Sequence, residues 1–246
     1  MTTMVRTFAK LFDHSIVRPD ATSEMVYYAA KTAVELGTAT LTVQPHYLRL
    51  AVDELKGTDV LVGSVVGFPH GNETPAMKEY QARAVLDLGA REIDMVMNIP
   101  ALKNHQKTVF MRDIRHVVAA STGYHAIVKV ILETCLLNEE EKQRACRWIS
   151  ETGARFVKTS TAYSTGGATL DDVRLMFRAV EGKCLVKAAG GVRTLDDVLA
   201  FLQAGARRFG STRTDQFVAE FEALPADKRQ AFDEFLAVPA GHGMTQ

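Results

Sequence analysis

The stretch "ETGARFVKTST", residues 151–161, contains the end of a helical pattern, a glycine, a short apolar strand and a lysine. The same order of features returns in "DLGAREID" at 87–94 and in "QAGARRFG" at 203–210. A glycine between a helix and a strand is typical of a helix C-cap. A repeated helix–glycine–strand unit predicts parallel strands joined by helical crossovers.

The hydrophobic pattern extends this unit over the whole chain. Short apolar runs predict strands near 8–14, 38–43, 60–66, 92–97, 125–132, 155–159, 183–188 and 207–210. Amphipathic patterns predict helices near 22–36, 46–56, 74–88, 105–120, 138–151, 169–180, 194–204 and 214–235. Eight such units in 246 residues favour a closed (β/α)8 TIM barrel over an open sheet. We expect a single α/β domain over residues 1–246, with a loose tail from about 239.

The composition argues against several classes of protein. Lys and Arg together number 29, as do Asp and Glu, so no basic excess points to a nucleic-acid partner. We also expect no membrane association, because no apolar stretch approaches the roughly 18 residues of a spanning helix. The histidines lack the spacing of metal ligands, and three cysteines are an odd number for disulfides. We therefore expect a cytoplasmic protein without metal or cofactor.

Three lysines share one position in the repeat. Lys129, Lys158 and Lys187 each follow a valine, and successive lysines are separated by one unit of the repeat. We expect them at equivalent positions in neighbouring strands, pointing into the barrel. Asp94 lies in the preceding strand pattern. One carboxylate and three ammonium groups would then converge in an apolar interior, where unpaired charge is costly.

Two interpretations of these charges are possible. A structural salt-bridge network would tend towards charge balance, which three cations and one anion do not give. The functional interpretation uses the excess, because desolvation and a neighbouring cation keep a lysine neutral and nucleophilic. In that interpretation Lys158 forms a Schiff base, Lys187 lowers its proton affinity and Asp94 carries protons.

The loops after the last strands are rich in glycine and hydroxyl side chains. Such loops bring backbone N–H groups close to an anion, and this fold commonly binds phosphate there. We expect a phosphate site with Arg193 as a clamp. Its other residues would be Gly190, Gly191, Gly210, Ser211 and Thr212.

Several motifs together resemble the 2-deoxyribose-5-phosphate aldolase family. They are "LFDHSIVRPDAT", "VVGFPHGNET", "EIDMVMNIPALK", "VKVILETCLL", "FVKTSTAYSTGGAT" and "VKAAGGVRT", in order over residues 11–212. The resemblance implies a metal-free class I aldolase of (β/α)8 fold. Such enzymes reversibly cleave 2-deoxy-D-ribose 5-phosphate to acetaldehyde and D-glyceraldehyde 3-phosphate.

The resemblance also assigns roles to individual residues. It implies that Lys158 is the Schiff-base lysine, Lys187 the second active-site lysine and Asp94 the acid/base group. Lys129 and Asp13 would support them. Thr161, in the motif that carries Lys158, is a further supporting residue. Homodimers are common in this family, so a homodimer is possible.

Four positions depart from the common family pattern. Thr42 and Gln44 replace Cys and Asn, Arg18 replaces a usual Lys at a position expected on the surface, and Arg213 follows Thr212. These changes leave the exact substrate open. The alternatives are a Schiff-base lyase for another phosphorylated aldehyde and a non-catalytic barrel that binds a phosphosugar.

Overall fold

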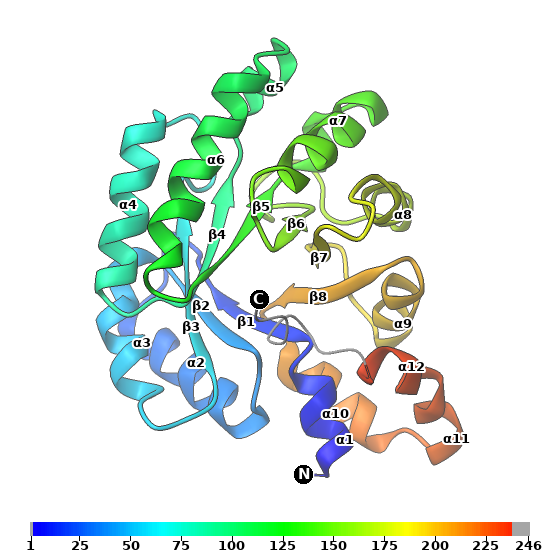
Figure 1. The fold of residues 1–246 in the computed structure, drawn as a ribbon. Coiled ribbons are helices and arrows are strands. Elements are labelled where there is room, and N and C mark those ends of the chain that lie inside the picture. Colours follow the sequence, from blue (N-terminus) through cyan, green and yellow to red (C-terminus); the bar gives the residue numbers. More distant parts are fainter. Residues whose placement is uncertain (1, 238–246) are drawn as a thin grey trace.

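The protein is a closed barrel of eight parallel strands surrounded by helices (Figure 1). This computed structural model describes residues 2–237, and the tail expected from about 239 lies outside them. The strands are β1 Phe12–Ile16, β2 Thr40–Val43, β3 Leu61–Val66, β4 Glu92–Val96, β5 Ile127–Ile131, β6 Phe156–Lys158, β7 Leu185–Ala189 and β8 Ala206–Ser211. The predicted (β/α)8 fold is confirmed.

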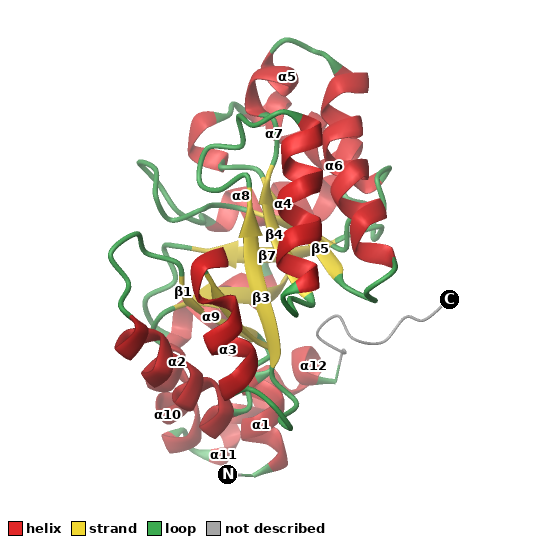
Figure 2. Cartoon of the chain, turned by 90° about the vertical axis from the view of Figure 1, so that its left-hand side faces the viewer, coloured by secondary structure: helices red, strands yellow, loops and turns green. Residues whose placement is uncertain are grey.

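Helices and short helical turns connect and cover the strands (Figure 2). The α-helices are α1 Thr3–Ala9, α2 Ser23–Leu36, α3 Leu48–Glu54, α4 Pro75–Asp87, α5 Ile99–Lys103, α6 Lys107–Thr122, α7 Glu139–Ser150, α8 Leu170–Ala179, α9 Leu195–Gln203, α10 Thr214–Ala223, α11 Ala226–Arg229 and α12 Asp233–Leu236. The 3₁₀ turns are η1 Pro45–Tyr47, η2 Thr134–Leu136 and η3 Gln230–Phe232. None of the helices within residues 2–237 combines the length and apolarity needed to cross a bilayer.

The helix ends follow the sequence signals. The repeat glycines Gly37, Gly89, Gly153 and Gly205 all have positive φ. At Gly205 a side chain has no room, since a Cβ would lie 2.3 Å from Cγ of Phe177. The hydroxyl of Thr194 accepts from the N–H of Asp197, whose carboxylate accepts from the N–H of Thr194, which completes a capping box.

The amino-terminal segment differs from the prediction. Residues 8–14 were expected to form a strand, but Phe8 belongs to helix α1 and strand β1 begins at Phe12. The ring of Phe8 stacks on Phe221 of α10 at 4.0 Å, and α1 lies beside α10 and α12 (Figure 1). The short apolar run was ambiguous, because helix and strand periods cannot be separated over so few residues.

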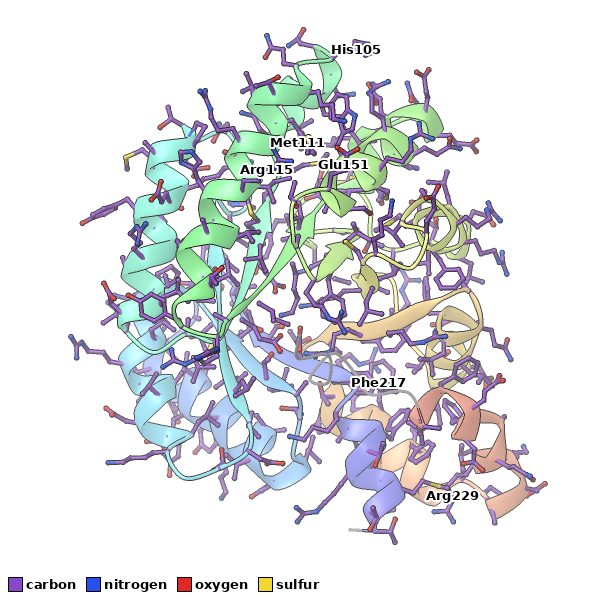
Figure 3. All side chains as sticks on the ribbon, viewed as in Figure 1. His105, Met111, Arg115, Glu151, Phe217 and Arg229 are labelled. Carbon is purple, nitrogen blue, oxygen red and sulfur yellow. The ribbon has the colours of Figure 1, made fainter. Side chains whose placement is uncertain are left out.

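The carboxy-terminal segment is also more broken than expected. A single helix was predicted over 214–235, whereas the structure has α10, α11, η3 and α12. Leu224 takes an extended conformation before Pro225, as a residue preceding proline commonly does, and this ends α10. Phe217 of α10, labelled in Figure 3, stacks on Phe12 at 5.5 Å and joins this helix to strand β1.

The outer helices are joined by polar contacts as well as by the apolar core. Arg115 of α6 donates to the carbonyl of Glu151, just after α7, at 3.2 Å, and Figure 3 labels both residues. Between α4 and α6, Lys78 and Asp113 form a fully buried ion pair of 2.6 Å. These contacts lie outside the barrel interior, which holds a separate group of charged side chains.

Candidate active site

The strand register places two of the three lysines at one level and the third deeper. Lys158 lies opposite Lys187 in the pairing of β6 and β7, whereas its partner on β5 is Ile131. Lys129 therefore sits two residues nearer the amino end of its strand. The expectation of equivalent positions was wrong for Lys129, because strands in a closed barrel tilt and their register shifts around the ring.

All three lysine side chains point into the barrel as predicted. Lys129 and Lys187 have no exposed surface, and Lys158 is 7% exposed. Asp94 of β4 joins the upper two lysines, because its Oδ2 is 2.6 Å from Nζ of Lys158 and 2.7 Å from Nζ of Lys187. The Lys187 ammonium also contacts Oδ2 of Asp13, on β1, at 2.5 Å.

A deeper layer of charge supports this upper layer. Nζ of Lys129 lies 2.6 Å from Oε2 of Glu92, 2.8 Å from Oδ1 of Asp94 and 3.0 Å from Oδ2 of Asp13. Beside it, Nη1 of Arg208 lies 2.6 Å from Oδ1 of Asp13 and 3.2 Å from Oε2 of Glu92. The barrel interior thus holds a continuous network of ion pairs.

The network differs from the one expected from the pattern of lysines. Among the described residues, three carboxylates face four cations, in place of one carboxylate facing three lysines, because Glu92, Asp13 and Arg208 also point inward. Glu92 was detectable, since it stands two residues before Asp94 and strand side chains alternate between faces. Arg208 was not, because Arg207 beside it made the inward residue ambiguous.

Burial and ion pairing shift the pKa values of these groups in opposite directions. Burial alone would raise the pKa of Asp94, but Lys129, Lys158 and Lys187 hold it well below its usual range. Burial would lower the pKa of Lys129, yet Asp13, Asp94 and Glu92 raise it. For Lys187 burial dominates, and despite Asp13 and Asp94 its pKa falls to about 8.

A pocket of about 340 Å³ opens above the network at the carboxyl ends of the strands. Lys158 lines this pocket, whereas Lys187 and Asp94 are buried beneath it. Of the other residues named from the sequence, the pocket brings together Thr161, Gly190, Gly210, Ser211 and Thr212. Lys158 and the glycine–hydroxyl loops therefore share one cavity.

Gly191 and Arg193, which were also expected in the phosphate site, do not line the pocket that holds Lys158. They line a neighbouring cavity of about 550 Å³ together with Cys135 and Lys142. The N–H of Arg193 donates to Asp197 at 2.9 Å, within the cap of helix α9. Gly191 has a positive φ, and a Cβ there would lie 2.7 Å from the carbonyl oxygen of Ala168, so close contact between two loops requires this glycine.

Two arginines face the pocket with Lys158. Arg18, expected to be a surface replacement, lines the cavity and pairs with Asp20 at 2.5 Å. Arg213 also lines the cavity, and its Nε donates to Gln216 at 2.7 Å. The substitution pattern at both positions was visible in the sequence, but only the path of the β1–α2 loop shows that Arg18 reaches the site.

The sequence reasoning missed two further features of the pocket wall. Phe68, after β3, packs edge-on against Tyr163, after β6, with ring centroids 5.5 Å apart. Thr161 donates its hydroxyl to Oε2 of the buried Glu133, which also accepts from the N–H of Thr161 at 3.3 Å. Glu133 thereby holds the loop that directly follows Lys158. Its only sequence signal was an acid at the end of a strand.

Comparison with known proteins agrees with this geometry. The family model described as DeoC/LacD family aldolase matches residues 7–213. The chain belongs to the DeoC/LacD family of aldolases. It is 46% identical over 206 residues to a deoxyribose-phosphate aldolase of Listeria innocua, a match that covers 84% of this chain and 92% of the relative.

Solved structures of aldolases also resemble this chain. A candidate deoxyribose-phosphate aldolase from Coccidioides immitis matches with a TM-score of 0.85 and 37% identity, over 89% of this chain and 87% of that one. A deoxyribose phosphate aldolase from Aeropyrum pernix, described as a unique tetramer, matches with a TM-score of 0.82 and 27% identity, over 90% and 93%. No group of three or more His, Cys, Asp or Glu residues within 2–237 is placed to hold a metal ion.

Proposed function

We propose that the protein is a class I aldolase that reversibly cleaves 2-deoxy-D-ribose 5-phosphate to acetaldehyde and D-glyceraldehyde 3-phosphate. The observation that carries this proposal is the position of Lys158, which belongs both to the buried charge network and to the pocket above it. The 46% identity to a relative named deoxyribose-phosphate aldolase supports the choice of substrate.

The reaction begins at Nζ of Lys158. The neutral amine attacks the aldehyde carbon of the open-chain sugar, and loss of water gives a protonated imine. The imine accepts the electron pair of the C2–C3 bond as the C3 hydroxyl loses its proton. D-Glyceraldehyde 3-phosphate leaves, the enamine gains a proton at carbon, and water then releases acetaldehyde and restores the amine.

Asp94 and Lys187 lie beside the amine, where Asp94 holds the two lysine nitrogens together and Lys187 can exchange protons. Oδ2 of Asp94 contacts both lysine nitrogens, so a proton lost by Lys158 has a short path to Lys187. Asp94 stays anionic because its pKa is held low by Lys129, Lys158 and Lys187 against the effect of burial. Lys187, with a pKa of about 8, is the group that exchanges protons near neutral pH.

The phosphate binds at the other side of the pocket in this proposal. Gly190, Gly210, Ser211 and Thr212 line that cavity with Lys158, and their N–H and hydroxyl groups suit an anion. Arg213 lines the same cavity and can pair with phosphate oxygens. The position of Arg193 in the neighbouring cavity favours Arg213 as the clamp.

The first test is chemical trapping of the imine. The protein is incubated with acetaldehyde and borohydride, and the adduct is located by mass spectrometry. A reduced two-carbon adduct on Lys158 that requires acetaldehyde is the expected result. A folded protein without that adduct would remove the aldolase mechanism and favour the binding barrel. Cleavage assays with several phosphorylated sugars distinguish the proposed substrate from other phosphorylated aldehydes.

The compartment and the assembly are part of the same proposal. Cys146 and Cys184 are buried free thiols and Cys135 is an exposed one, which suits a reducing cytoplasm. A homodimer is the default for a soluble oligomer, while the Aeropyrum pernix relative is described as a tetramer. Analytical ultracentrifugation at several concentrations distinguishes the two assemblies.

A further inference from the structure

Seven charged side chains from residues 2–237 meet inside the barrel, and their charges do not cancel. The anions are Asp13 on β1 and Glu92 and Asp94 on β4. The cations are Lys129 on β5, Lys158 on β6, Lys187 on β7 and Arg208 on β8. The neighbouring strands β2 and β3 contribute the neutral side chains Thr40, Thr42 and Ser64 to the buried polar set. With every group ionised, these seven side chains carry one excess positive charge among them.

A buried excess charge is relieved when one lysine releases a proton. Arg208 does not release it, because a guanidinium stays protonated in proteins. Lys129 is held charged by three carboxylates within 3.0 Å. The proton therefore leaves the Lys158–Lys187 pair, which shares Oδ2 of Asp94 at 2.6 and 2.7 Å. The neutral amine that imine formation needs therefore arises within this pair.

Glu92 and Arg208 contribute to the charge of this buried group, but they do not line the pocket. Both are completely buried in the deeper layer, and neither lines the cavity that holds Lys158. Arg208 contacts Asp13 at 2.6 Å, and Asp13 in turn contacts Lys187 at 2.5 Å. Glu92 contacts Lys129 at 2.6 Å, and Lys129 contacts Asp94 at 2.8 Å. Arg208 is thus connected to Lys187 through one residue, Asp13. Glu92 is connected to the Lys158–Lys187 pair through two residues, Lys129 and Asp94.

We propose that Glu92 and Arg208 are positioning residues that fix how many protons the Lys158–Lys187 pair holds, and that they act in opposite directions. Glu92 stabilises the protonated pair, and Arg208 favours release of one proton. The proposal rests on the Schiff-base role of Lys158 given above. It adds that two residues remote from the substrate set the pH at which that lysine becomes reactive.

Because Glu92 and Arg208 carry opposite charges, their neutral variants should shift the pH dependence of trapping in opposite directions. A residue with a structural role alone would not produce this pair of shifts. Glu92→Gln keeps the side-chain shape and removes a negative charge, so the network gains a second excess positive charge. Arg208→Gln removes a positive charge and leaves the ionised network neutral. The readout is the rate of trapping of acetaldehyde on Lys158 by cyanoborohydride between pH 5 and 10, followed by mass spectrometry. Because the neutral amine is the reacting form, the trapping rate is expected to rise with pH to a plateau.

We expect the midpoint of this rise to move by about one pH unit in each variant. In Glu92→Gln it moves to lower pH, because the added positive charge expels the proton. In Arg208→Gln it moves to higher pH, because the proton is retained. The double variant Glu92→Gln/Arg208→Gln has the same total charge as the natural chain. Its midpoint is therefore expected at the same pH as that of the natural chain.

Two controls separate charge from stability. Arg208→Lys keeps the positive charge with a different shape, so its midpoint should match the natural chain even where the protein is less stable. Asp113→Asn disrupts the buried pair with Lys78 outside the barrel interior. That variant should lose stability in urea and keep the trapping midpoint. If Glu92→Gln alone does not fold, the difference in midpoint between Arg208→Gln and Arg208→Lys tests whether the charge at this position sets the midpoint.

The outcomes distinguish this proposal from the proposed function. If Lys158 forms the adduct but the midpoints of the single variants stay in place or move in the same direction, the positioning role is overturned and the aldolase survives. Equal midpoints for Arg208→Gln and Arg208→Lys overturn it as well. If the natural chain forms no adduct on Lys158 at any pH, both proposals fail.

Discussion

Lys158 lies directly opposite Lys187 in the register of β6 and β7, and both ammonium groups contact the same carboxylate oxygen of Asp94. One anion between two cations cannot neutralise both. The arrangement therefore lets a proton leave one nitrogen while the other keeps its charge. The lower exposure of Lys187 makes Lys158 the member of the pair that meets a ligand.

Replacement of the proposed nucleophile is the first prediction. Lys158→Arg keeps a cation beside Asp94, but a guanidinium stays protonated and does not form an imine. We expect a folded protein whose kcat for cleavage falls by more than about 10⁴-fold. Steady-state kinetics and a thermal melt check both parts. Lys103→Arg, at a surface ion pair with Glu141, is the matched control. A Lys158→Arg enzyme within tenfold of the control would contradict the Schiff base.

The second prediction concerns the pH dependence and Lys187. Its pKa of about 8 means that its ammonium form dominates below pH 8 and its neutral form above. Lys187→Met removes the cation that shares Oδ2 of Asp94 with Lys158, and this leaves the carboxylate to Lys158 alone. We expect trapping of acetaldehyde on Lys158 to require a pH about one unit higher than in the natural chain. A midpoint that moves to lower pH would contradict this electrostatic role.

The third prediction separates the two candidate phosphate arginines. Arg213 lines the pocket with Lys158, whereas Arg193 lines the neighbouring cavity. Loss of one charged hydrogen-bond donor costs about 1.5–3 kcal/mol, so Arg213→Ala should raise KM for the phosphorylated sugar about tenfold or more. Cleavage of unphosphorylated 2-deoxyribose should be unchanged. Arg193→Ala should change KM less than about threefold, and a larger effect than that of Arg213→Ala would restore Arg193 as the clamp.

The fourth prediction addresses the buried pair between α4 and α6. Nζ of Lys78 lies 2.6 Å from Oδ2 of Asp113 and 2.9 Å from the carbonyl of Val96, and neither charged side chain is exposed. Lys78→Met leaves a buried carboxylate without its cation, and we expect a loss of about 3–5 kcal/mol in urea unfolding. The double variant Lys78→Met/Asp113→Leu should recover most of that loss and keep kcat. A double variant less stable than the single one would show that the pair contributes net stability.

The fifth prediction is the acid limit of stability. The pKa values of Asp13 and Asp94 are held low in the fold, since the neighbouring cations outweigh the effect of burial. Below about pH 4 the unfolded chain binds protons that the folded chain does not, so the free energy of unfolding falls with the pH. The loss continues until these groups are protonated in the folded state. Urea titrations from pH 7 to 3 should show this fall, with a shallower slope for Asp94→Asn. An equal slope would contradict it.

The barrel and the inward position of Lys158 were predictable from local patterns. The recurrence of "GARFVK"-type segments reflects a repeated βα unit, and period-two alternation within each strand assigns an inward face to Lys158. Family motifs added the roles of Lys187 and Asp94. Glycines at helix ends were readable because a left-handed cap favours that one residue type. The helix α1 was missed, because its short apolar run fits two periods equally.

The tertiary structure alone decided which charges meet. Lys129 is one layer deeper than the equal spacing implied, because strand tilt shifts the register around a closed barrel. Arg208 entered the network through the pairing of β8, and Arg18 reached the pocket through the path of its loop. The sequence alone determined the repeating unit and the inward face of Lys158, since both depend on short-range periodicity. Charge pairing and the position of the arginines that line the two cavities depend on distances between separate strands and loops, which only closure of the barrel establishes.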